Sequence, residues 1–186
     1  MRKLFAIALL AGTSAAIAAP SVSAQSSVMV GGQSMLRTKD IVDNAVNSAD
    51  HTTLVAAVKA AGLVETLKGR GPFTVFAPVN DAFENLPDGT VQNLLKPENK
   101  TALTKVLTYH VVPGRYDGAA LMKAIKAGNG RATLKTASGG TLTAMMNGPM
   151  NVVVRDDGGN VASISTYDVN QSNGVIHVIN KVLLPK

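Results

Sequence analysis

The stretch of the chain that most constrains its fold is Gly71–Pro87, GPFTVFAPVNDAFENLP. After a Gly-Pro turn, the apolar run from Phe73 to Ala77 predicts a buried strand. Pro78 ends this strand because proline has no N–H to donate to a neighbouring strand. Asn80 or Asp81 is then placed to cap a helix that carries further apolar residues. A buried strand that passes directly into an amphipathic helix requires both elements to pack around one core.

Residues 1–24 have the pattern of a secretory signal peptide. Arg2 and Lys3 precede the apolar stretch from Leu4 to Ala19, and Val22-Ser23-Ala24 matches the small-x-small pattern of a cleavage site. A membrane anchor is the alternative, but polar and small residues interrupt the apolar run and end it. We therefore expect an exported protein that is periplasmic, secreted or held at the cell surface.

The rest of the chain has the length of one domain and contains no cysteine, which excludes disulfides, thiol chemistry and cysteine-ligated metals. Residues 25–38 are polar and Gly-rich without apolar periodicity, which predicts a flexible N-terminal arm. Residues 39–186 form the predicted domain. The signal peptide holds two of the eighteen Lys and Arg residues and none of the twelve acids, so the remainder has a formal charge of +4. This modest excess indicates solubility rather than a polyanion-binding surface.

Short amphipathic helices are predicted throughout the first half of the domain. Apolar residues recur at helical spacing over short segments, and most segments begin at an acidic residue or a proline suited to a helix start. The predicted starts are Asp40, Asp50, Asp88, Pro97 and Asp117, and Gly62 and Gly128 are predicted ends.

Strands dominate the second half of the domain. Five runs rich in Val, Ile and Thr are separated by turns that contain Gly and Asn, as in a meander of hairpins. The runs cover residues 131–137, 141–146, 150–155, 161–167 and 175–184. Helices first and strands second, with one strand inserted early, predict an α+β domain built on an antiparallel sheet or a small sandwich.

Three segments, in this order and spacing, resemble the conserved motifs of the fasciclin-like domain family. They are FTVFAPVNDAF, LTYHVVPGRY and NGVIHVINKVLLP, and the resemblance extends from Lys39 to Pro185. Val79 stands where the family commonly has threonine, which leaves Asn80 or Asp81 to cap the following helix. The resemblance implies a wedge of antiparallel β-sheets flanked by short helices. It also implies a secreted, single-domain protein of the bacterial type that acts in adhesion or matrix contact rather than catalysis.

The resemblance also implies where a partner would bind. In animal relatives, binding has been attributed to a Tyr-His pair and to an Asp-Ile pair just before the last strand. Tyr109 and His110 match the first pair, and Asp168 and Val169 occupy the position of the second, with Val in place of Ile. The expected partner is a protein or polysaccharide of the cell surface or matrix. Some algal and bacterial members bind carotenoids, so a carrier of an apolar small molecule is a second class of function.

The histidines are not part of a recognisable catalytic motif. The sequence contains no G-x-S-x-G elbow, no phosphate-binding loop and no H-E-x-x-H zinc helix to which His51, His110 or His177 could be related. His110 continues an apolar helical row and His177 shares a strand face with apolar residues, so both are predicted to be hydrogen-bonded core residues. No carboxylate lies at ligand spacing beside either, and Asp156 to Asn160 lacks the spacing of a calcium loop. The hypothesis is therefore a protein that is not an enzyme and holds no cofactor or metal.

Basic residues surround the predicted helix-to-strand junction near Gly128. Together they could bind an acidic polysaccharide or a lipid headgroup through charge, an interaction that salt would weaken. Few aromatic residues accompany them, so a nucleic-acid partner is not expected. A solvated surface is the alternative, and we prefer it. The residues are Lys123, Lys126, Arg131 and Lys135.

Methionines mark the predicted site for an apolar ligand. Met145, Met146 and Met150 flank one predicted turn, and Met122 lies on the preceding helix. Methionine is flexible and polarizable, and it is common on adaptable binding surfaces. Because neighbouring residues of a strand point to opposite faces, one of Met145 and Met146 should be exposed unless something covers it. Packing in the core is the alternative interpretation.

Overall fold

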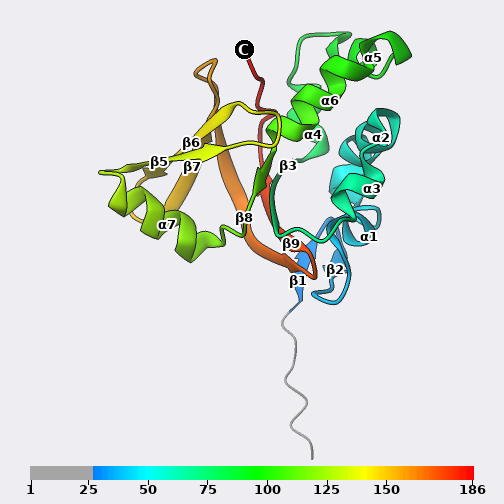
Figure 1. Cartoon of the computed structure of the whole chain (residues 1–186). Helices are drawn as coiled ribbons and strands as arrows, with labels where there is room; N and C mark the ends of the chain where they lie inside the picture. The colour runs from blue at the N-terminus through cyan, green and yellow to red at the C-terminus, as the bar shows by residue number, and fades with distance from the viewer. Residues whose placement is uncertain (1–26) are drawn as a thin grey trace, which may run out of the picture.

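The computed structural model describes residues 27–186 (Figure 1). The predicted signal peptide lies outside the described residues. In the predicted arm, β1 (Val28–Val30) and β2 (Gln33–Met35) form an antiparallel hairpin, so the prediction of a flexible arm is wrong there. Gly31 and Gly32 both have positive φ, which allows the tight turn, and the last residue of each strand, Val30 and Met35, is buried in the domain.

Seven further strands form one sheet in the order β4-β3-β9-β8-β7-β6-β5. β3 and β9, the second and third strands in this order, pair in parallel, whereas the other neighbouring strands of this sheet are antiparallel. The predicted α+β class is confirmed, and the parallel β3–β9 pair is the departure from the predicted antiparallel arrangement. The strands are β3 (Phe73–Pro78), β4 (Val111–Pro113), β5 (Arg131–Lys135), β6 (Thr141–Asn147), β7 (Asn151–Arg155), β8 (Val161–Gln171) and β9 (Gly174–Ile179).

The helices are short, and several begin or end where the sequence placed a cap. Asp40 accepts a hydrogen bond from the N–H of Asp43 at 2.8 Å, and Asp117 accepts one from Ala120 at 2.8 Å. Gly62 ends α2 in the left-handed conformation. The helices are α1 (Ile41–Ala45), α2 (Thr52–Ala61), α3 (Val64–Leu67), α4 (Asn80–Glu84), α5 (Thr90–Leu94), α6 (Lys100–Tyr109) and α7 (Gly118–Ala127), with the 3-10 turns η1 (Ala49–His51) and η2 (Pro97–Asn99).

The sheet is so strongly curved that its two end strands, β4 and β5, meet. Ala137, just after β5, donates its N–H to the carbonyl oxygen of Val111 in β4 at 2.7 Å. We call the apolar cluster inside this curve the inner core. It includes Phe76 of β3 and Leu121 of α7, both fully buried, so α7 closes the curve on one side.

The opposite face of the β3–β9 pair carries a second apolar cluster, which we call the outer core. Alternation along β3 directs Phe76 into the inner core and Val75 and Ala77 into the outer core. Side chains of α1, α2, α3 and the β1–β2 hairpin cover this outer face, on the side of the sheet away from α7 (Figure 1). The β3–β9 pair is therefore covered on both faces.

The stretch from β3 into α4 forms as predicted, except for its cap. α4 begins at Asn80, but no side chain caps its first turn. The Asn80 side chain instead reaches the start of α2, where Oδ1 accepts a hydrogen bond from the N–H of Thr53 at 3.0 Å and Nδ2 donates to the carbonyl oxygen of Ala49 at 2.8 Å. The predicted cap serves a different helix because the first turns of α2 and α4 lie side by side.

Candidate functional site

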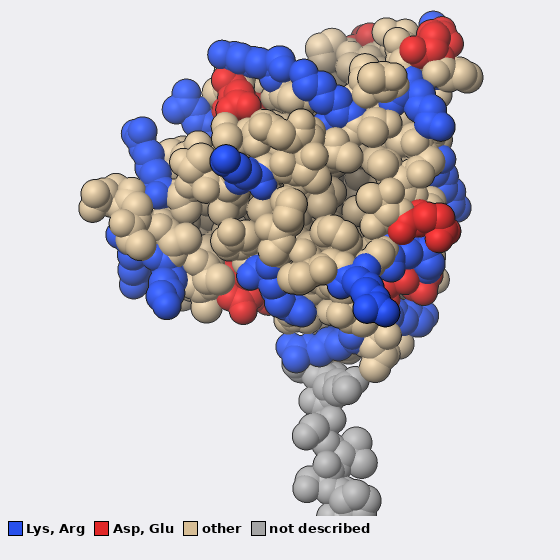
Figure 2. Space-filling model, in the orientation of Figure 1, with Lys and Arg blue, Asp and Glu red and all other residues tan. Residues whose placement is uncertain are grey.

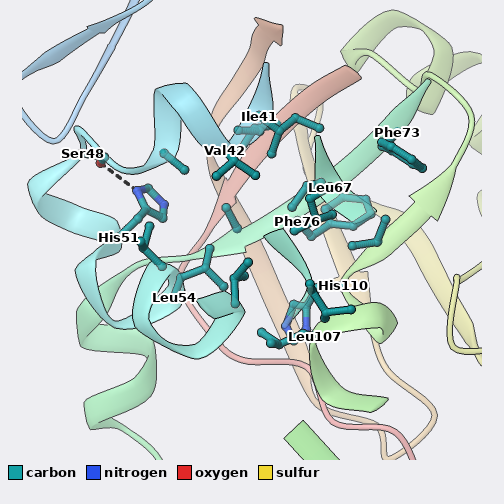
Figure 3. Close-up of a pocket in the computed structure, with 18 of the residues that line it drawn as sticks. Ile41, Val42, Ser48, His51, Leu54, Leu67, Phe73, Phe76, Leu107 and His110 are labelled. Carbon is teal, nitrogen blue, oxygen red and sulfur yellow. Dashed lines mark hydrogen bonds between the residues drawn. The ribbon is translucent and has the colours of Figure 1, made fainter. Parts of the chain in front are cut away.

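An apolar pocket lies between the outer face of the sheet and the helices α1 to α3 (Figure 3). Its volume is about 110 Å³. Val75, Ala77 and Ile176 of β3 and β9 line it on the sheet side, and Leu54 and Val58 of α2 line it on the helical side. The pocket therefore continues the outer core toward the surface.

The helical wall of this pocket is partly exposed to solvent. Leu54, Val55 and Val58 fall on one face of α2, and Leu63 and Val64 continue this surface toward α3. All five side chains are half-buried. A ligand in the pocket would remove some of this apolar surface from water, which is favourable by roughly 25 cal/mol per Å².

His51 lies at the start of α2 with its ring against the pocket. Ser48 Oγ and His51 Nδ1 are 2.9 Å apart, whereas the buried Nε2 has no hydrogen-bond partner among the described residues. Figure 3 shows Nε2 on the side of the ring that faces the other lining residues. Burial lowers the pKa of His51, although the charge of Asp50 and the nearby backbone of Ala77, which is outside hydrogen-bond geometry, oppose this effect. The ring is therefore neutral at pH 7.

Tyr109, the first residue of the predicted Tyr-His pair, is fully buried. Its hydroxyl donates to the carbonyl oxygen of Thr141 at 2.6 Å and accepts a hydrogen bond from the N–H of Asp157 at 3.0 Å. Burial raises the pKa of Tyr109 to about 12, so the hydroxyl stays protonated. Tyr109 thus joins the end of α6 to β6 and to the turn between β7 and β8.

His110 is buried with both ring nitrogens hydrogen-bonded, which confirms the prediction of a core histidine. Nε2 accepts a hydrogen bond from the N–H of Leu183 at 2.9 Å, so the ring proton is on Nδ1, which donates to the carbonyl oxygen of Val106 at 2.8 Å. Burial lowers the pKa of His110 to about 4. A neutral His110 therefore fastens the C-terminal segment to α6.

His177 is also a buried structural histidine, as predicted. Its Nε2 donates to the carbonyl oxygen of Tyr116 at 2.7 Å, and its ring lies between those of Phe76 and Tyr167, at centroid distances of 5.8 and 5.9 Å. Burial lowers the pKa of His177. Within residues 27–186, no three His, Cys, Asp or Glu side chains gather as a metal site.

The second predicted pair lies at an irregular point of β8. Asp168 has a φ of 57°, and its Oδ1 accepts a hydrogen bond from the N–H of Gly118, the first residue of α7, at 2.7 Å. Val169 is buried in the outer core. Of the four residues in the two pairs, Asp168 alone is partly exposed, and a partner-binding role for any of them stays a prediction.

Residues 49–185 match the family model of the fasciclin domain. This chain belongs to the fasciclin domain family. The match includes all three motifs, so the family resemblance predicted from them is confirmed.

Several relatives share this fasciclin domain. Protein sll1483 of Synechocystis sp. is 49% identical to it over 146 residues, which cover 78% of this chain and 73% of that protein. Transforming growth factor-beta-induced protein ig-h3 of Sus scrofa is 37% identical over 133 residues, covering 71% of this chain and 17% of that protein. A solved FAS1 domain pair from the insect cell adhesion molecule fasciclin I has the same fold, with a TM-score of 0.70 at 18% identity, over 78% of this chain and 51% of that one.

The predicted methionine site and the pocket of this fasciclin domain are in different places. Met122 and Met146 pack against the inner core, Met145 is half-buried, and Met150 is 76% exposed in the turn between β6 and β7. Among the pocket-lining residues the methionine is Met35 of β2. The packing of α7 and β6 directs the predicted methionines to the inner core or to solvent, so the structure moves the candidate apolar site to α1–α3.

The four predicted basic residues are exposed but point in different directions. Ala132 of β5 faces α7 in the inner core, so alternation turns Arg131 and Lys135 to the other face of the sheet, away from Lys123 and Lys126 on α7. Figure 2 shows Lys and Arg side chains around the visible face, with a largely uncharged area between them. Polyanion binding by these residues stays a prediction.

The sequence interpretation missed the pocket residues Ser48 and His51. A signal was present, because His51, Leu54, Val55 and Val58 have the spacing of one helical face. The unpartnered Nε2 could not be read from this spacing, since it depends on how the outer face of the sheet packs against α2.

In the part of the chain that the structure describes, no helix is long and apolar enough to span a membrane.

Proposed function

We propose that this fasciclin domain is an exported, non-enzymatic interaction module that binds a protein or polysaccharide of the cell surface or matrix. The observation that carries the proposal is the shared fold with the FAS1 domain pair of fasciclin I, which is described as an insect cell adhesion molecule. The predicted signal peptide is consistent with a role outside the cytoplasm, in the periplasm, in the medium or at the cell surface.

Asp168 is the candidate contact residue because it is the partly exposed member of the two predicted pairs. The other members of the two pairs, Tyr109, His110 and Val169, are buried, so they would support a contact surface only by holding the backbone in place. The carboxylate of Asp168 also stabilises the start of α7 through Gly118. A useful variant must therefore remove the charge and keep the hydrogen-bond acceptor.

Asp168→Asn meets this requirement, since asparagine keeps an acceptor oxygen and tolerates a positive φ. Attachment of the purified variant to intact cells and to their isolated matrix would be compared with that of the original protein and of an Asp157→Asn control. We expect Asp168→Asn to lower attachment at an unchanged melting temperature. Equal attachment would remove Asp168 from the proposed site, and no attachment by the original protein would overturn the adhesion proposal.

A second candidate function is transport or storage of an apolar small molecule such as a carotenoid. The observation that favours it is the apolar pocket with its half-exposed wall on α2. Protein exposed to an extract of its native cells would be examined by visible absorbance and by mass spectrometry of a solvent extract. A bound molecule that Val58→Phe excludes would support this candidate, and a protein that retains nothing would contradict it.

A further inference from the structure

We propose that the pocket beside α2 binds an uncharged, mostly apolar molecule through one hydroxyl or carbonyl group, which hydrogen-bonds to His51 Nε2. This inference rests on the second proposed function and adds the chemistry of the ligand. It is carried by the juxtaposition of an apolar pocket with a buried ring nitrogen that has no partner among the described residues.

The His51 ring is well placed to select a polar atom. Both His51 and Ser48 are 3% exposed, and their mutual contact uses Nδ1 and leaves Nε2 facing the pocket (Figure 3). Buried polar groups are almost always hydrogen-bonded, so an unpartnered one in a pocket that opens to solvent indicates where a partner binds. The Ser48 hydroxyl can donate or accept, which leaves Nε2 either a donor or an acceptor. A ligand hydroxyl can pair with Nε2 in either case, because it both donates and accepts. A ligand carbonyl can pair with Nε2 only when Nε2 carries the proton and donates it.

The remaining polar groups of the lining do not favour a charged ligand. His110 uses both nitrogens within the protein, and the Thr108 hydroxyl donates to the carbonyl oxygen of Thr104. Lys59 and Thr66 are exposed, so they lie toward the mouth. A carboxylate beside the neutral His51 ring would lose its hydration without gaining an opposite charge.

The size of the pocket limits the part of the ligand that it encloses. A dry cavity of about 150 Å³ lined by aliphatic and aromatic residues takes benzene. The volume here is about 110 Å³ and one wall is open, which suits one ring or a short branched chain. A longer molecule would extend outward past Val55 and Val58. The part of the ligand inside the pocket would therefore be a ring that carries an oxygen. This ring could be a free small molecule or the end of a long pigment.

Phenol and benzene are matched probes, because they differ only in the hydroxyl group. Each would be titrated into the ¹⁵N-labelled protein, with the backbone amides of α2 and the imidazole nitrogens of His51 followed by NMR. A satisfied buried hydrogen bond should make phenol bind about tenfold more tightly than benzene. Phenol, and not benzene, should shift the Nε2 resonance of His51. This readout uses the unaltered protein and so does not depend on any variant folding.

Two variants and one control variant test whether the preference for phenol depends on His51 and whether both probes bind in the pocket. His51→Phe should abolish the preference for phenol while benzene still binds, and Val58→Phe should exclude both probes by filling the pocket. Met145→Phe, on β6 and outside the pocket lining, should change neither affinity. Thermal unfolding of each variant would establish that it is folded. A phenol preference that persists in His51→Phe would overturn the inference.

The outcomes separate this inference from the proposed carrier function. If both probes bind equally, water completes the hydrogen bonding of His51, and the inference fails while an apolar carrier stands. If neither probe binds, both fail. Zeaxanthin and β-carotene, which also differ in their ring hydroxyls, would extend the test to long molecules. Preferred binding of zeaxanthin that His51→Phe removes would identify the ligand as a pigment end, and phenol binding without it would identify a free small molecule.

Discussion

His110 Nε2 accepts a hydrogen bond from the backbone N–H of Leu183 at 2.9 Å, which fastens the C-terminal segment to the end of α6. Protonation of this nitrogen would replace an acceptor with a second donor and break the contact. The pKa of His110 is about 4 in the folded protein, against about 6.5 for an exposed histidine. The unfolded chain therefore takes up the proton first as the pH falls.

Folding stability should consequently decrease in mild acid. The stabilising effect of neutral His110 is fully present above about pH 6.5, and it is lost progressively toward pH 4, by about 3 kcal/mol. Burial lowers the pKa of His51 and His177 as well, so they act in the same direction. Urea unfolding at about pH 7.5, 5.5 and 4.5 would measure the decrease. His110→Gln should be less stable at neutral pH but show a shallower pH dependence, and an equal slope would contradict this explanation.

The Tyr109 hydroxyl should contribute to stability because it is buried and makes two hydrogen bonds, with Thr141 and Asp157. Tyr109→Phe leaves both backbone partners unsatisfied, at a cost of about 1–3 kcal/mol in the free energy of unfolding. Tyr116→Phe is a matched control, since the Tyr116 hydroxyl makes no side-chain hydrogen bond among the described residues and should cost little. If Tyr109→Phe abolished attachment while its stability was unchanged, a direct partner-binding role would replace the structural one.

Phe76 and Phe73 should differ in their effect on stability although both belong to the same strand. Phe76 is fully buried in the inner core and stacks on His177, whereas Phe73 is half-buried at the edge of the outer core. Phe76→Ala should lower the free energy of unfolding by about 3–5 kcal/mol, and Phe73→Ala by less. Chemical denaturation of the two variants at neutral pH tests this order, and equal losses would contradict the division into two cores.

Asn80 should stabilise the domain through α2 rather than through its own helix. Asn80→Ala removes the acceptor for the N–H of Thr53 and the donor to Ala49, which should cost about 1–2 kcal/mol. Asp81→Ala, one residue later and exposed, should cost a few tenths of a kcal/mol. The two variants compared by urea unfolding decide whether the cap lies on α2 or α4. A larger loss for Asp81→Ala would favour α4.

The sequence predicted the individual helices and strands of this fold better than it predicted which elements lie next to one another. Local chemistry was sufficient for the strand at Phe73, the caps at Asp40 and Asp117, and the hairpins after Gly128, because each depends on residues close in the chain. The target of the Asn80 side chain and the parallel pairing of β3 with β9 depend on contacts between distant segments. No local pattern records such contacts.

The candidate site, too, was predictable where it depends on local sequence and unpredictable where it depends on contacts between distant segments. His110 could be assigned to the core because its apolar helical row is visible in the sequence, whereas His51 could not be assigned to a pocket without the sheet beneath it. The methionines near residue 146 had the right chemistry for an apolar site, but the strand and helix that carry them face the inner core. The methionines indicated an adaptable apolar surface, but the position of the apolar pocket depends on how the helices pack against the sheet.

The parallel pairing of β3 with β9 has a consequence for how the protein is made. Phe73 of β3 lies beside Gly174 of β9, so β3 can pair with β9 only after nearly the whole chain has been synthesised. A nascent chain shorter than this holds β3 with one side open, and neither core can close. Completion of the domain is therefore expected to wait for β9, the last strand of the chain to be synthesised.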